Sequence, residues 1–125
     1  MAVTYNTTLT NQRLTLVVNA IDAGAGNGVL YIGTAGMAAI LATIILAKPC
    51  GTVASRVLTF SVPRTDVAAD AAGTAEAARI EDSAGTIVVS GLTVGLAASS
   101  PDIIISSTTV TIGDIVSLIS ATITG

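Results

Sequence analysis

The first regular pattern of apolar residues in the chain has the spacing of a helix. Four apolar residues recur at i, i+3, i+4 and i+7, and these are Leu14, Val17, Val18 and Ile21. Thr7 or Thr8 can cap the start of this helix, and Gly24 can adopt the left-handed conformation that ends it. The pattern predicts one amphipathic helix over residues 7–23.

After the glycines that follow, the apolar residues form short runs with a period of two. These runs have strand length, are rich in Val, Ile and Thr, and are separated by Gly, Pro, Asp and Ser. The expected strands are Val29–Ile32, Ile40–Leu46, Val57–Val62, Thr86–Leu92, Asp102–Ser106, Thr109–Ile112 and Ile115–Thr124. The expected breaks and loops are Gly33–Gly36, Lys48–Gly51, Pro63, Arg64–Gly73, Gly95–Asp102 and Gly113–Asp114.

The segment Thr74–Asp82 fits two structures. Its part Ala75–Glu81 contains good helix formers, but only enough for about two helical turns. Asp82-Ser83-Ala84-Gly85 has the composition of a hairpin turn, and a hairpin requires a strand before it. We favour the strand and keep the helix as the alternative.

Together these elements amount to about eight short strands with turns every eight to twelve residues, preceded by one helix. That spacing is typical of a sandwich, a jelly roll or a small barrel. We expect an all-β protein with one short N-terminal helix, folded as a jelly-roll-like β-sandwich. The length fits a single domain over residues 1–125, with an N-terminal arm and helix at 1–24 and a β core at 28–125.

One apolar segment, Val29–Ala47, is long enough and free enough of charge to be considered as a membrane span. The sequence Gly33-Thr34-Ala35-Gly36 in its middle favours a turn, and the flanking runs are β-branched. A small membrane protein is therefore the less favoured alternative. Residues 1–12 lack the basic start and the apolar run of a secretory signal, so none is expected.

The composition limits the surfaces that this chain can present. Hydrophobic residues make up 51% of the sequence and charged residues only 10%, with a net charge of −3. Its few basic residues form no stripe, and Tyr5, Tyr31 and Phe60 are the only aromatics, so nucleic-acid binding is not expected. A surface with so little charge favours packing against neighbouring proteins.

The residues that usually carry chemistry give no catalytic pattern. Gly24–Gly28 follows a helix and leads into a strand, the reverse of a phosphate-binding loop. The chain has no histidine to activate a Ser or Thr nucleophile, and Cys50 is its only cysteine. The acidic residues do not have calcium-loop spacing and are expected to be solvated charges: Asp66, Asp70, Glu76, Glu81 and Asp82. We expect no enzyme, no cofactor, no metal and no small-molecule substrate.

Several phrases, in this order along nearly the whole chain, resemble a known group of proteins. They are Ala20-Ile21-Asp22-Ala23-Gly24-Ala25-Gly26, Ile32-Gly33-Thr34-Ala35-Gly36-Met37, Leu41-Ala42-Thr43-Ile44, Ala78-Arg79-Ile80-Glu81-Asp82-Ser83-Ala84-Gly85, Val88-Val89-Ser90-Gly91-Leu92-Thr93-Val94-Gly95 and Ser120-Ala121-Thr122-Ile123-Thr124. The chain resembles small virion structural proteins of tailed bacteriophages, and among these the capsid cement or decoration proteins. It departs from that pattern at Tyr31, at Lys48-Pro49-Cys50 and at Arg56.

The resemblance implies a dimer or trimer that is made in the bacterial cytoplasm and binds the outside of an icosahedral head. Its partner would be the major capsid protein, whose neighbouring subunits it would staple together. The N-terminal arm and helix, or the loops Arg64–Gly73 and Gly95–Asp102, are the expected contacts. Another virion component, from the tail, the neck or a fibre, is the alternative.

Overall fold

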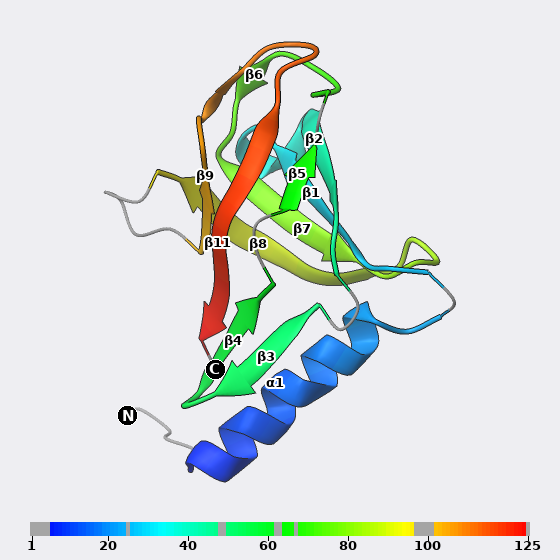
Figure 1. Cartoon of the computed structure of the whole chain (residues 1–125), viewed down its shortest axis with the longest axis vertical. Coiled ribbons are helices and arrows are strands. Elements are labelled where there is room, and N and C mark those ends of the chain that lie inside the picture. Colours follow the sequence, from blue (N-terminus) through cyan, green and yellow to red (C-terminus); the bar gives the residue numbers. More distant parts are fainter. Residues whose placement is uncertain are drawn as a thin grey trace.

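The computed structural model describes residues 6–24, 26–47, 50–61, 64–66, 68–96 and 102–124, and Figure 1 shows their arrangement. The elements are α1 (Thr7–Ile21), β1 (Val29–Gly33), the short 3₁₀ helix η1 (Ala35–Met37), β2 (Ile40–Ile45), β3 (Gly51–Ala54), β4 (Val57–Phe60), β5 (Arg64–Asp66), β6 (Gly73–Thr74), β7 (Ala77–Glu81), β8 (Ile87–Gly95), β9 (Ile103–Ile105), β10 (Thr109–Val110) and β11 (Val116–Thr124). The predicted all-β class with one short N-terminal helix is confirmed. Ala77–Glu81 is a strand, as favoured.

The strands form one curled, mixed sheet and a separate two-stranded ribbon. Neighbours in the sheet follow the order β2-β1-β7-β8-β9-β11-β4-β3, with β5 also pairing β11, and β10 pairs β6. The β8–β9 pair is parallel and the other pairs are antiparallel.

The curl brings the edge of β2 close to the segment that follows β5. The amide of Thr43 donates to Asp66 Oδ2 at 2.9 Å, and the amide of Asp70 donates to the carbonyl of Leu41 at 2.7 Å. Because these bonds satisfy backbone groups that would otherwise face solvent, the edge of β2 is covered.

The core lies inside the curled sheet and under α1. Alternate residues of β1 and β7 point inward, so that Leu30, Ile32, Ala78 and Ile80 are buried. The predicted apolar face of the helix packs on the same cluster, with Leu14, Val18 and Ile21 buried and Val17 partly buried. The largest fully buried side chains are Phe60, Ile21, Leu30, Ile32, Leu41, Ile44, Leu46, Leu58, Ile80, Ile103, Ile105 and Leu118.

The two ends of α1 differ in detail from the prediction. Asn6, not Thr7 or Thr8, is the N-cap, and its side chain accepts a hydrogen bond from the amide of Leu9 at 2.7 Å. Asn is among the best N-cap residues. Asn6 precedes both threonines, which lie in the first turn of the helix. The helix ends at Ile21, and Gly24 then has a φ of +90°, as the sequence predicts.

The helix is fixed to the β3–β4 hairpin at the lower end of the molecule (Figure 1). Ser55 and Arg56 form the two-residue turn of this hairpin with φ of 50° and 69°, a conformation that usually requires Asn and Gly. Asn11 Oδ1 accepts a hydrogen bond from the Arg56 amide at 2.9 Å, and Thr7 Oγ1 accepts one from Arg56 Nε at 3.2 Å. The helix therefore supports a strained turn.

Three strands are not predicted by the sequence. It places a break at Gly51 and no strand over residues 51–54, but β3 forms there because each of its residues pairs with β4. It predicts a loop over Arg64–Gly73, but β5 opens this segment by pairing with β11, and β6 at its end pairs with β10. The predicted break at Lys48-Pro49, Pro63, the N-terminal arm before Asn6 and residues 97–101 of the Gly95–Asp102 loop lie outside the described residues.

The segment considered as a membrane span is folded as β1, η1 and β2. Within the part of the chain that the structure describes, no helix has the length and apolarity needed to cross a membrane.

Candidate functional site

The outward side of the β2-β1-β7-β8 region carries two rows of side chains that run across the strands. Strand register places Ile45, Val29, Glu81 and Ile87 side by side in one row across the four strands. A second row holds Thr43, Tyr31 and Arg79. These seven residues are called the outer face below. Residues directly opposite one another on paired antiparallel strands share a face and lie about 5 Å apart, so each row is continuous.

Two isoleucines of the outer face are exposed to solvent. Ile45 is 49% exposed and Ile87 is 54% exposed, although exposing an aliphatic side chain to water is unfavourable. They stand at the two ends of the first row, on β2 and β8. The rigid strands therefore present apolar side chains at both sides of a polar centre.

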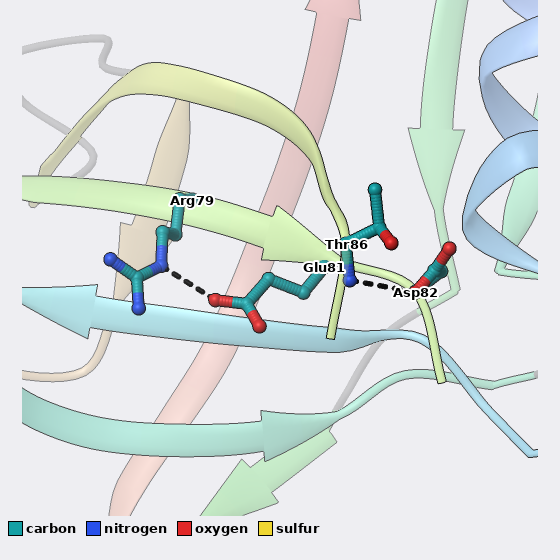
Figure 2. Close-up of polar contacts among 4 residues, drawn as sticks. All are labelled: Arg79, Glu81, Asp82 and Thr86. Carbon is teal, nitrogen blue, oxygen red and sulfur yellow. Dashed lines mark hydrogen bonds and ion pairs between the residues drawn. The ribbon is translucent and has the colours of Figure 1, made fainter. Parts of the chain in front are cut away.

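That polar centre is an ion pair held against an aromatic ring. Arg79 Nε donates to Glu81 Oε2 at 2.7 Å (Figure 2). The Arg79 guanidinium also lies 5.3 Å from the centre of the Tyr31 ring. The Glu81 side chain is only 12% exposed and that of Arg79 is 30% exposed. The guanidinium is thus oriented by the carboxylate and by a cation–π contact.

Glu81 corrects the prediction that the acidic residues are all solvated. It lies between Val29 and Ile87 in the sheet, and the tip of the next hairpin approaches its carboxylate at Gly85. A carboxylate so enclosed needs a partner, because burying an unpaired charge is costly. Arg79 supplies that partner.

The hairpin beyond β7 is held by its own first residue. Asp82 Oδ1 accepts hydrogen bonds from the amides of Ala84 and Thr86, both at 2.9 Å, and Figure 2 shows the bond from Thr86. Gly85 has a φ of +89°. Ser83 Oγ donates to the carbonyl of Ala23 at 3.0 Å, which ties the hairpin to the segment after α1. The predicted turn at residues 82–85 is confirmed.

Two of the remaining acidic residues, Asp66 and Asp70, support the fold. Asp66 accepts the Thr43 amide, and Asp70 Oδ2 accepts the Thr43 hydroxyl at 2.9 Å, so both hold the segment after β5 against β2. Glu76 is exposed and directly precedes β7. Among the described residues, no three His, Cys, Asp or Glu side chains are grouped so that they could hold a metal ion.

The glycine-rich connector and Cys50 are also accounted for by packing. The connector follows α1 and leads into β1, in the order that the sequence indicates, and a Cβ at Gly28 would overlap the Ile21 side chain. Cys50 is fully buried, and its amide donates to the Asp22 carboxylate at 3.2 and 3.3 Å. Burial, followed by the nearby charge of Asp22, raises the pKa of the Cys50 thiol to about 12. Such a thiol is a poor nucleophile at neutral pH.

The sequence predicts neither the outer face nor the ion pair between Arg79 and Glu81 at its centre. Tyr31, Arg79, Ile45 and Ile87 come from four strands, and only the strand register brings them together. The one local signal is the alternation of Arg79 and Glu81 in β7, which places both on the same side of that strand.

Comparisons with models of protein families, with curated proteins and with solved structures find no match to this chain.

Proposed function

We propose that this chain is a structural protein of a tailed-bacteriophage virion, acting as a capsid cement or decoration protein on the outside of the head. It works by packing against the major capsid protein and against copies of itself, as a dimer or trimer. In this role it catalyses no reaction and needs no cofactor, nucleic acid, membrane or small-molecule substrate.

The observation that carries the proposal is the outer face, an ordered sheet surface with exposed isoleucines around an oriented arginine. Burying the exposed half of Ile45 or Ile87 would contribute about 1 kcal/mol each. Tyr and Arg are the residue types that most often dominate protein interfaces, and here Tyr31 and Arg79 form the second row. The low charge of the whole chain, 10%, also favours association between proteins.

A protein that bridges shell subunits needs more than one contact surface. The outer face is the surface through which copies of this chain pack on one another. The sheet that carries it is one wall of the buried core, so its side chains are held before binding and little order is lost on association. Association at this face would leave other surfaces of each copy available to the shell.

The copy number in purified particles tests the proposal. Quantitative mass spectrometry should find this chain in phage heads at a copy number of the same order as that of the major capsid protein. A far lower copy number would identify a tail, neck or fibre component instead. Absence from particles would refute a virion role.

A second measurement tests the site. Ile87→Lys places a charge in the outer face, whereas Thr52→Lys places the same charge at an exposed position of β3. Ile87→Lys should lower the amount of chain on heads, and Thr52→Lys should not. Equal occupancy of the two variants would show that the outer face makes no contact in the particle.

A further inference from the structure

The turn between β10 and β11 exposes two isoleucines at the end of the molecule opposite α1 (Figure 1). Ile112 is 74% exposed and Ile115 is 66% exposed. They lie on either side of Gly113-Asp114, where the sequence indicated only a break. Residues 111–115 are called the tip below.

The tip is a firmly held turn. The amide of Asp114 donates to the carbonyl of Thr111 at 3.0 Å, and the amide of Thr111 donates back to Asp114 Oδ2 at 2.9 Å. Gly113 occupies the third turn position with a φ of +88°, as a type II turn requires. The two isoleucines are thus carried on a closed turn.

A second layer of hydrogen bonds joins the tip to the segment after β5. The amide of Gly113 donates to the carbonyl of Ala69 at 3.0 Å, and the amide of Ala69 donates to the carbonyl of Asp114 at 2.8 Å. Ala69 itself is buried. Because the turn is fixed before any partner arrives, binding through Ile112 and Ile115 would lose little backbone entropy.

Among the side chains that the structure describes, the charged ones nearest the tip are acidic. Asp114 and Asp70 are exposed there, and Asp66 is half-buried beside Thr43. The arginine side chains that the structure describes lie elsewhere, Arg13 and Arg56 at α1 and its hairpin and Arg79 on the outer face. A surface that complements the tip therefore carries Lys or Arg. Anionic lipid surfaces would repel it.

We propose that the tip is a docking element that inserts Ile112 and Ile115 into an apolar pocket with a basic rim on a different protein. The isoleucines supply the apolar contact, and Asp70 and Asp114 lie where they face the rim. If the proposed function is correct, that protein is the major capsid protein. The inference does not depend on this, because it rests on the exposure, the rigidity and the charge of the tip.

Photo-crosslinking from the tip tests the proposal. The full chain, carrying benzoylphenylalanine at position 112, is produced in the cells in which it is naturally made and irradiated there, and adducts are identified by mass spectrometry. We expect an adduct with a second protein, attached at an apolar segment that contains or borders Lys or Arg. Ile115→Asp in the same chain should lower the adduct yield about 10-fold or more, whereas Ile115→Val should leave most of it.

A probe at Leu16 is the matched control, because that leucine is 68% exposed on α1, at the opposite end. It should not label the same segment of the partner. An adduct between two copies of this chain, an adduct with lipid, or no adduct from position 112 would each overturn the proposal.

The result also separates this inference from the proposed function. A partner outside the virion would support the docking element and refute the shell role. Abundant chain in heads with no adduct from the tip would refute the docking element alone.

Discussion

The hydrogen bond from the Arg56 amide to Asn11 should be one of the most consequential single contacts between α1 and the sheet. Ser55 and Arg56 both have positive φ, which costs a residue other than glycine about 1 kcal/mol or more. The turn tolerates this because Asn11 Oδ1 accepts the Arg56 amide at 2.9 Å in a partly buried position. Asn11→Ala removes that acceptor and leaves the amide without its partner.

The expected cost follows from two opposing effects. Loss of a hydrogen bond with a partly buried donor left unpaired destabilises a protein by about 1–2 kcal/mol. The change to alanine within a helix returns about 0.5 kcal/mol of helix propensity. Asn19→Ala receives the same propensity gain, because Asn19 is an exposed residue of the same helix. The difference between the two variants therefore isolates the tertiary bond.

Urea unfolding followed by circular dichroism measures this difference. With a slope of about 2 kcal/mol per M, the midpoint of Asn11→Ala should lie ~0.5–1 M below that of Asn19→Ala, with no change in slope. Hydrogen exchange at the Arg56 amide should also become faster in Asn11→Ala alone. If both variants unfold at the same urea concentration, Asn11 does not support the turn and the reasoning is wrong.

Three further predictions concern single sites. Cys50 should resist alkylation in the folded chain. Because burial raises its pKa to about 12, the free energy of unfolding should fall as the pH rises above about 8.5, the thiol pKa of the unfolded chain. Cys50→Ala should remove this part of the pH dependence in urea titrations. Asp82→Ala should destabilise the chain by about 1–2 kcal/mol and expose the Thr86 amide to exchange, whereas Asp82→Asn, which keeps an acceptor oxygen, should cost much less. Ile87→Lys should shift the chain toward the monomer in light scattering, and an unchanged mass relative to Thr52→Lys would exclude the outer face from self-association.

The parts of the fold that the sequence predicts are those fixed by neighbouring residues. The buried face of α1 follows from its 3.6-residue period, and β7 follows from the hairpin composition at residues 82–85. In both cases the decisive interactions lie within a few positions of one another. Such local patterns can be recognised without knowing how distant parts of the chain pair.

The parts that were missed depend on distant partners. β3 has no strong strand pattern and forms because it pairs β4, and β5 forms because it pairs β11. The sequence predicts Glu81 to be a solvated charge of the hairpin, because only the strand register shows that it lies between Val29 and Ile87. The sequence predicts only a break at the tip, because the hydrogen bonds that fix its backbone come from Ala69, which is distant in the sequence.

The ion pair at the centre of the outer face is better understood as a device for specificity than for stability. A partly buried pair gains little net free energy, since desolvation offsets most of the attraction between the two charges. An apolar residue in place of Glu81 would extend the row between Ile45 and Ile87 into a continuous hydrophobic strip that could pack in many registers. Arg79 is held over Tyr31 and is already paired with Glu81 through Nε, so a surface that closes over the isoleucines has to accept hydrogen bonds from the guanidinium N–H groups that it takes out of water. If the outer face makes the proposed contact, its polar centre therefore restricts which surfaces can bind there.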